Sequence, residues 1–196
     1  MKLAMGDELT LSYDGTQNLW FYARKLGHVI GDNVATVANR GASITGPRRI
    51  DLVSRSKRTN FRSYDGIIMF YGLHDYLDRS GNLGVIAHDL TQAIQNIHHA
   101  NPKAKLYGIL PFNIYQPDGT SDINVRKKGH YTFRDLLAML AVTYSNNFVP
   151  ALNWATLRVP LVTKMNQKRH LNHGIYPNRA TYEAMIKIIG KFVKDH

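Results

Sequence analysis

Short apolar stretches alternate along this chain with longer stretches in which apolar residues recur at helical spacing. Strand-like runs occupy residues 2–5, 34–39, 66–71, 105–110 and 148–152. Helix-like runs occupy residues 19–26, 86–97, 133–141 and 182–193. Strands that alternate with helices are joined by crossovers, which place them in a parallel sheet with helices on both faces. The alternation predicts a three-layer α/β/α fold, and we expect a single domain over residues 1–196.

The ends of two helices are marked by particular residues. Gly27 follows the first helical run and is expected to end it, and Asn101-Pro102 is expected to end the second. Long connections are also informative. Residues 111–131 form a run of about twenty residues after the fourth strand, and loops of that length are usually functional or disordered. We expect either a lid or specificity loop, or a disordered insertion.

The composition is that of a globular protein: 196 residues, 44% of them hydrophobic, with no cysteine. The lack of cysteine excludes disulfides, thiolate metal sites and cysteine nucleophiles. No run reaches the roughly 20 apolar residues that span a bilayer. Met1-Lys2 leads directly into the first expected strand, which predicts a cytoplasmic protein, or an extracellular one if a leader has been removed. The oligomeric state is left open.

Positive charge is the unusual feature of the composition. Lys and Arg number 25 against 14 Asp and Glu, a formal net charge of +11. The excess forms three clusters, at residues 40–62, 126–134 and 164–169, and Asp51 is the single carboxylate within residues 40–62. Such a charge favours an anionic ligand, small or polymeric, although a plain solvated basic surface explains it equally well. No specific nucleic-acid motif accompanies it.

Four short motifs are spread along the chain. They are Gly6-Asp7-Glu8-Leu9, Asn39-Arg40-Gly41-Ala42, Gly72-Leu73-His74-Asp75 and His173-Gly174-Ile175-Tyr176. In order and spacing they resemble the four blocks of the SGNH (GDSL-type) ester hydrolases. The resemblance covers nearly the whole chain and implies a flavodoxin-like five-stranded parallel sheet in the order 2-1-3-4-5. Parallel sheets of this kind bind ligands outside the carboxyl ends of the strands. Glu8, Gly41 and His74, each just past a strand, are expected to converge there.

The residues that carry the family's chemistry are largely replaced. Matched by position, Glu8 stands for the nucleophilic Ser, His74 for the oxyanion-binding Asn, His173 for the Asp and Tyr176 for the His, while Gly41 retains its type. Tyrosine has a pKa near ~10 and is no general base at neutral pH. Glu8 is expected to open a helix-side turn and to place its carboxylate in the oxyanion hole. Asp7 is expected to brace that turn. The resemblance therefore implies a fold without the serine-esterase mechanism.

Other arrangements of these side chains stay open. Glu8, His74 and His173 have the composition of a two-histidine, one-carboxylate metal site, which Tyr176 or His170 would support. Alternatively, Glu8 is hydrogen-bonded by Tyr176 or by one histidine. Glu8 and His74 would also make a general acid–base pair. The hydroxyls nearby, listed here, are expected to cap backbone groups: Thr10, Ser12 and Ser43.

Two functions follow. The leading hypothesis is a non-catalytic, pseudohydrolase-like binding domain for an acyl- or glycan-bearing and anionic ligand, with Glu8, Gly41, His74, His173 and Tyr176 as binding positions. No cofactor is implied. The alternative is a hydrolase of ester bonds with a rebuilt Glu/His site, with or without a metal.

Overall fold

The computed structural model describes residues 1–79 and 81–196, and its centre is a five-stranded parallel sheet. The strand order is β2-β1-β3-β4-β5, as the resemblance implied. The strands are β1 (Lys2–Gly6), β2 (Val34–Ala38), β3 (Gly66–Phe70), β4 (Lys105–Ile109) and β5 (Ala151–Leu152). β3 lies in the middle and is buried throughout, whereas β2 is a half-buried edge strand.

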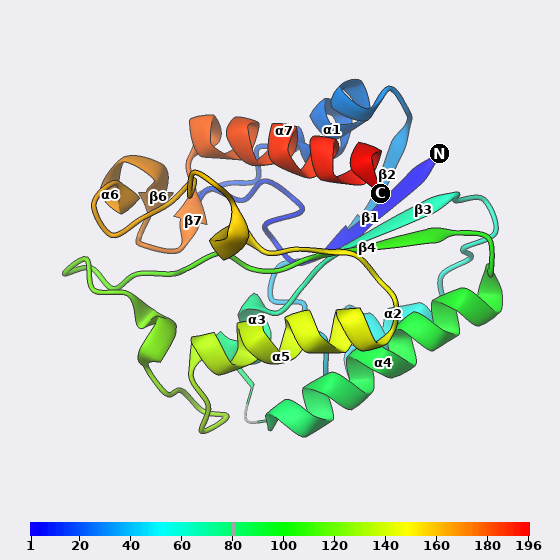
Figure 1. Cartoon of the computed structure of the whole chain (residues 1–196), viewed down its shortest axis with the longest axis horizontal. Helices are drawn as coiled ribbons and strands as arrows, with labels where there is room; N and C mark the ends of the chain where they lie inside the picture. The colour runs from blue at the N-terminus through cyan, green and yellow to red at the C-terminus, as the bar shows by residue number, and fades with distance from the viewer. Residues whose placement is uncertain (80) are drawn as a thin grey trace.

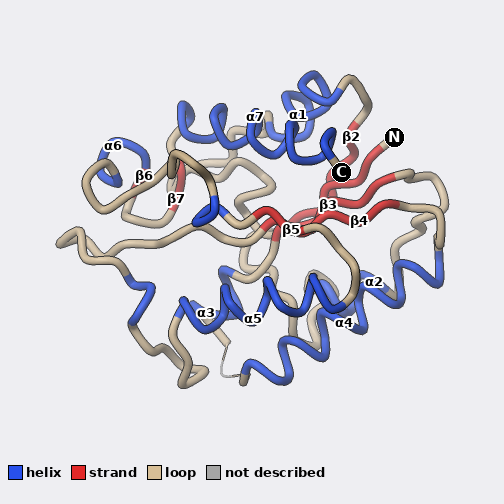
Figure 2. The backbone as a smooth tube through the Cα atoms, in the orientation of Figure 1, coloured by secondary structure: helices blue, strands red, loops and turns tan. Residues whose placement is uncertain are grey.

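Helices cover both faces of the sheet (Figures 1 and 2). α1 (Tyr22–Ile30) and α7 (Arg179–Asp195) pack together on one face. The other face carries α2 (Leu52–Ser56), α3 (Leu73–Leu77), α4 (Leu83–Ala100) and α5 (Phe133–Asn146). The prediction of a three-layer α/β/α fold is confirmed. None of the helices in the described part of the chain has the length and apolarity needed to cross a bilayer.

Local sequence explains where the long helices begin and which face they bury. The Asn82 side chain caps α4 by accepting the Val85 N–H at 2.9 Å. Thr132 and Asp135 form a capping box at the start of α5. One set of apolar positions in α4 recurs every three or four residues and is buried, whereas Val85 of the same helix is 45% exposed. The buried set is Ile86, Leu90, Ala93, Ile94 and Ile97. One stripe of each helix therefore joins the core between the layers.

Two boundaries differ from the prediction. Gly27 lies inside α1, where it packs closely on the Asp32 carbonyl, and the left-handed Gly31 (φ +73°) ends the helix. The fifth strand is short, because Phe148 is 96% exposed with a φ of +56°, which interrupts extended backbone. Asn101 does end α4, as predicted. The short helices α2 and α3 were not predicted, because five residues carry too little periodicity.

The register of the sheet brings three loops to one edge. Gly6, the last residue of β1, lies beside Ala38 of β2 and Phe70 of β3. The segments that begin at residues 7, 39 and 71 therefore leave the sheet side by side. Near the same edge lies a hairpin of two short strands, β6 (Leu171–Asn172) and β7 (Tyr176–Pro177). The short helix α6 (Gln167–His170) and the loop 111–131 lie there too (Figure 2). Both chain termini lie at the other end.

The loop 111–131 is fastened to α3 by two buried tyrosines. The Tyr76 hydroxyl donates to the carbonyls of Asp122, in the 3-10 turn η1 (Asp122–Asn124), and of Val125, at 3.1 and 2.8 Å. The Tyr131 hydroxyl donates to the Asp75 carbonyl at 2.5 Å. The loop is thus packed onto the fold at several points along its length.

Candidate functional site

Glu8 is the centre of the cluster at this edge. The residue is 2% exposed, and both of its carboxylate oxygens are bound. Oε2 accepts the Gly41 backbone N–H at 2.9 Å, and Oε1 lies 2.5 Å from Nε2 of His74. Of the two hydrogen-bonding partners left open by the sequence, Tyr176 or one histidine, the structure places a histidine on Glu8, and the other carboxylate oxygen accepts the Gly41 N–H.

The Glu8 backbone lies in a series of turns. The Asp7 carbonyl accepts the Thr10 N–H at 3.2 Å, and the Glu8 carbonyl accepts the Leu11 and Tyr13 N–H groups at 3.1 and 2.9 Å. Glu8 opens a run of turns, as expected, but the helix N-terminus expected beside it is not there, because α1 begins only at Tyr22. A hydrogen bond and an ion pair, and not a helix dipole, hold the carboxylate.

His74 is bound at both ring nitrogens. Nε2 meets Glu8, and Nδ1 meets the carboxylate of Asp78, one helical turn later in α3. Burial by itself would lower the pKa of His74, but the hydrogen bond and charge of Glu8, aided by Asp7 and Asp78, outweigh it and raise that pKa to about 9. Burial would likewise raise the pKa of Glu8, but His74 and the Gly41 N–H lower it. At neutral pH the pair is a carboxylate and an imidazolium.

Asp7 braces the turn, as expected. Its Oδ1 accepts the Leu9 N–H at 2.9 Å, while Oδ2 is buried with no partner among the described residues. Burial, and then the negative charge of Glu8, raise the pKa of Asp7 well above its usual value. Both causes favour the neutral form of Asp7, because a second negative charge beside Glu8 in a buried turn is unfavourable.

Two further carboxylates shape the Gly41 loop. Asp75 accepts the N–H groups of Ile44 and Thr45 at 2.8 and 3.1 Å. Asp51 accepts the N–H of Ser43 at 3.2 Å and that of Arg48 at 3.1 Å. Both carboxylates are fully buried. They fold the loop that aims the Gly41 N–H, with its φ of +71°, at Glu8.

Tyr176 lies beside the cluster, on the hairpin. Its ring packs edge-on against the ring of Tyr13, with 5.0 Å between the centroids. The Arg40 guanidinium in turn lies over the Tyr13 ring, 4.0 Å from its centroid. Arg40 also donates to the Tyr13 hydroxyl at 3.0 Å. Burial, and then the charge of Glu8, raise the pKa of Tyr176 to about 12. Tyr176 therefore holds its proton even more firmly than a free tyrosine.

His173 lies apart from the Glu8 pair. It is exposed, makes no side-chain hydrogen bond within residues 1–79 and 81–196, and faces Gly15. His170 bonds to the Thr181 hydroxyl at 2.9 Å. In the same described ranges no three His, Asp or Glu side chains gather as metal ligands would. The proposed ligand set of Glu8, His74 and His173 is thus not assembled in this structure.

Ser12 and Ser43 bond backbone groups, as expected, whereas Thr10, within the described residues, does not. Ser12 Oγ accepts the Tyr22 N–H at 3.1 Å, and Ser43 Oγ donates to the Thr45 carbonyl at 2.6 Å. Ser43 is completely buried beside Asp51, and its bonded neighbours include no histidine. Among the described residues, neither serine hydroxyl is hydrogen-bonded to a histidine that could act as its base. Thr10 Oγ1 is buried without a partner among the described residues.

No family model matches this sequence, and no curated protein matches it. Solved structures do match over the full length. A protein from Lactobacillus plantarum aligns with a TM-score of 0.77 at 17% identity, covering 100% of this chain and 96% of the other. The M. smegmatis aryl esterase aligns with a TM-score of 0.68 at 14% identity, and the carbohydrate acetylesterase Est24 from Sinorhizobium meliloti with a TM-score of 0.70 at 13% identity. Each alignment covers 99% of this chain and 98% of the other chain. The fold is that of the SGNH hydrolases.

Within the SGNH fold, the sequence pattern located the Glu8, Gly41 and His74 positions but missed several partners. Asp78 was missed, although it lies four residues after His74 and so shares its helix face. Tyr13 lay in no motif, and Arg40 was noted only as a neighbour of Gly41 and as part of the basic cluster at residues 40–62. Asp51 could have been recognised from the sequence as a structural acceptor, since it is the one carboxylate among the cations of residues 40–62.

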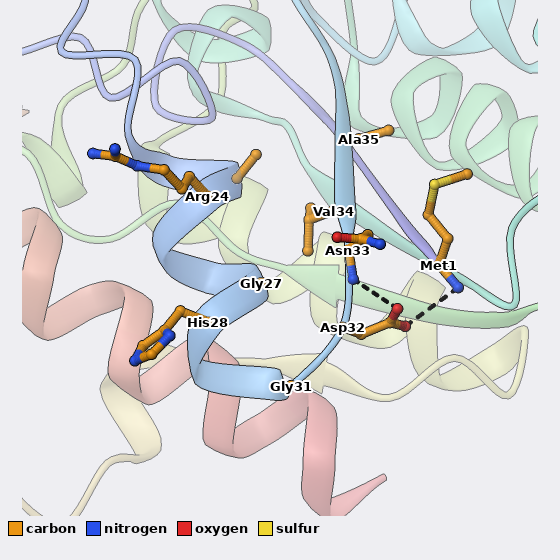
Figure 3. A pocket seen from close by; sticks show the side chains of 10 residues that line it. Met1, Arg24, Gly27, His28, Gly31, Asp32, Asn33, Val34 and Ala35 are labelled. Atoms are coloured by element: carbon orange, nitrogen blue, oxygen red, sulfur yellow. Dashed lines mark hydrogen bonds and ion pairs between the residues drawn. The ribbon is translucent and has the colours of Figure 1, made fainter.

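Of the cavities outside this cluster, two lie at opposite ends of the sheet. One of about 360 Å³ follows the ends of β4 and β5 at the same sheet edge, and its apolar lining includes Phe112, Leu137, Trp154, Leu161 and Val162. The other, about 680 Å³, lies at the opposite end of the sheet between α1 and β2 (Figure 3). There the Asp32 carboxylate forms an ion pair with the Met1 amino group, and the side chains of Arg24 and His28 extend from α1 (Figure 3). This second cavity is remote from Glu8.

Proposed function

We propose that this chain is a non-catalytic binding domain that retains the SGNH cleft for an acyl- or glycan-bearing ligand with anionic character. The observation that carries the proposal is the hydrogen bond from the Gly41 N–H to the Glu8 carboxylate at 2.9 Å. In an SGNH esterase that N–H is expected to stabilise the oxyanion. A fixed negative charge on the same donor opposes a second one there.

The remaining groups support the loss of chemistry. A serine esterase needs a nucleophile and a base within hydrogen-bond reach of it. His74 is protonated at neutral pH, since its pKa is about 9, and both ring nitrogens are engaged. Tyr176, with a pKa of about 12, accepts no proton either. A carboxylate, an imidazolium and a phenol therefore stand where nucleophile, oxyanion donor and base are expected.

The surroundings support retention of a ligand. The 360 Å³ cavity is lined mainly by apolar side chains and is of a size to hold a short acyl group. Arg40 stacks on Tyr13 next to the cluster and supplies positive charge at its rim. Related folds include a carbohydrate acetylesterase and a Clostridium thermocellum carbohydrate esterase in complex with cellohexaose, which is why acetylated glycans are included among the ligands to test.

The first test is chemical. The purified chain is incubated with a serine-directed fluorophosphonate probe and with p-nitrophenyl acetate, with and without divalent metal ions. We expect no labelling and no hydrolysis above the buffer rate. Stoichiometric labelling would end the proposal. Metal-dependent hydrolysis that disappears in Glu8→Ala would instead establish the alternative, a hydrolase with a rebuilt Glu/His site in which Glu8 and His74 act as a general acid–base pair.

The second test concerns the ligand. Acetylated oligosaccharides and a phosphate-rich polymer are titrated against the chain at low and high salt. If the basic cluster at 40–62 helps to bind the polymer, affinity will fall steeply with ionic strength. The triple variant Arg49→Ala, Lys57→Ala, Arg58→Ala should lose polymer binding, whereas Lys187→Ala, Lys191→Ala, Lys194→Ala on α7 should not. All six side chains are exposed. Equal losses in both variants would reduce the charge to a general surface property.

A further inference from the structure

We propose that a third cavity, between the β6–β7 hairpin, α6 and the loop after β4, binds a small oxyanion, the phosphate or carboxylate group of a small molecule. The cavity measures about 270 Å³. The residues that matter to its chemistry are Gln116, Gln167, Lys168, His173 and Gly174. None of them belongs to the Glu8–His74 pair, so this proposal stands independently of the proposed function.

Gln167 gives the strongest indication of a ligand. The residue is 4% exposed, and its side-chain amide makes no hydrogen bond within residues 1–79 and 81–196. Gly119 leaves room beside the amide: a Cβ at Gly119 would lie 3.2 Å from Nε2 of Gln167. The amide lines the cavity with no hydrogen-bond partner among the described residues, so an acceptor oxygen bound in the cavity would supply one.

The charge of the cavity selects an anion. Lys168 and His173 line it, and no carboxylate does. Residues 151–172, which supply the α6 side, contain no Asp or Glu. The carboxylate nearest in sequence is Asp118, and it already accepts the Thr120 N–H and hydroxyl at 2.8 and 2.7 Å. An amide donor beside two potential cations suits an oxyanion with several acceptor atoms.

The walls are held in place before any ligand arrives. His173 and Gly174 both have positive φ, +53° and +72°, and form the tight turn of the hairpin. The Gly174 carbonyl accepts the Tyr115 N–H at 2.8 Å, which fastens the turn to the loop after β4. On that loop, Gln116 and Thr120 close their own turn with a 2.8 Å hydrogen bond. A left-handed histidine is uncommon, and such strain is typical of binding sites. A preformed site loses less entropy on binding.

The test is a titration of the full chain with inorganic phosphate, with acetate and with neutral glycerol, followed by ¹H–¹⁵N NMR. We expect saturable shifts in the millimolar range at the Gln167 side-chain amide, at His173 and at Gly174, with phosphate or acetate but not with glycerol. The stronger of the two anions identifies the class of ligand head group.

Three variants locate the site. Lys168→Ala and the near-isosteric Gln167→Glu should each weaken anion binding by about tenfold or more, the loss expected for one charge-assisted contact. Arg169→Ala is the matched control, since Arg169 is an exposed neighbouring cation that does not line the cavity. Lys168 is exposed, so its removal leaves folding intact. The proposal is overturned if shifts do not saturate, if glycerol binds as well as the anions, or if Arg169→Ala weakens binding as much as Lys168→Ala.

Discussion

Oε1 of Glu8 lies 2.5 Å from Nε2 of His74, and the two side chains are 3% and 10% exposed. Two charges that face one another out of water depend on each other, because either one alone would be buried without compensation. The same N–O distance occurs between Lys25 and Glu183, but those side chains are 35% and 41% exposed. The molecule thus contains a buried pair and a solvated pair of equal length.

This contrast predicts a large coupling in one pair and a small one in the other. Glu8→Ala and His74→Ala should each lower the free energy of unfolding by about 3–5 kcal/mol. The double variant should cost clearly less than their sum, with a coupling of at least about 1 kcal/mol. The cycle on Lys25 and Glu183 should give less than about 1 kcal/mol. Urea unfolding measures both cycles, and equal couplings would contradict the burial argument.

The stability of the fold should fall as the pH rises from about 6.5 to about 9. The pKa of His74 is about 9 in the folded chain, against 6.5 for an unperturbed histidine. The folded state therefore holds a proton that the unfolded state releases in this window, and the stabilisation present below pH 6.5 is lost as pH passes the folded pKa. The loss is of the order of 3 kcal/mol.

Melting curves at several pH values check this, with His74→Gln beside the parent chain. The variant should show a much flatter profile above pH 6.5. Asp7→Asn is the necessary control, since the raised pKa of buried Asp7 gives a slope of the same sign. An unchanged slope in His74→Gln would assign the effect to Asp7 or to another group.

Reverting Glu8→Ser alone should not produce an esterase. The new hydroxyl would meet His74, whose pKa falls once Glu8 is gone, and Tyr176, which holds its proton with a pKa of about 12. If His74 takes the proton, it cannot also serve as the oxyanion donor expected at its position. Reverting Glu8→Ser, His74→Asn, His173→Asp and Tyr176→His together supplies nucleophile, donor and base. Both hairpin positions already face Gly15, and aspartate tolerates the left-handed backbone of residue 173.

Hydrolysis of p-nitrophenyl acetate and labelling by a phosphonate probe measure the outcome. The quadruple variant should be labelled at residue 8, and the single variant should not. Turnover by Glu8→Ser alone would mean that His74, released from Glu8 and held by Asp78, serves as the base.

Gly174 and Gly31 offer a matched pair for the hairpin. Their φ values are +72° and +73°, so an alanine is equally strained in backbone at either position. A Cβ at Gly31 would meet nothing within 4 Å, whereas one at Gly174 would collide with the Tyr115 carbonyl. Gly31→Ala should cost about 1–2 kcal/mol, and Gly174→Ala clearly more. Thermal unfolding compares the two variants. Equal losses of unfolding free energy would show that the hairpin can move away from Tyr115 without penalty.

Much of the fold follows from periodicity in the sequence. The five strands and four long helices each carry a repeating apolar face, and their alternation determines a parallel sheet. The fifth strand was placed too long because Val149 and Leu152 are apolar and buried, while the left-handed backbone of Phe148 has no signature in residue type. Gly27 was taken for a helix end for a related reason: close packing on the Asp32 carbonyl and a helix stop both select glycine.

The site was harder to predict than the fold. Glu8, Gly41 and His74 each follow a strand, so the sheet edge brings them together. The position of His173 depends on the tight turn at Gly174, which directs its side chain to another cavity. The roles of Asp51 and Asp75 as acceptors for loop N–H groups depend on tertiary folding, because a buried carboxylate and a solvated one look alike in a sequence.

The contacts between the first loop and the end of the chain have a consequence for biosynthesis. Asn172 donates to the Asp14 carbonyl at 2.6 Å, and Tyr182 of α7 donates to the Tyr13 carbonyl at 2.7 Å. The first three strands can pair once residue 70 has been made, since β1 is hydrogen-bonded to β2 and β3 alone. The loop that carries Glu8 must wait for residues 171–182. The Glu8 loop is therefore completed by contacts with residues that lie 158 and 169 positions later in the sequence, long after the strands that flank it have been made.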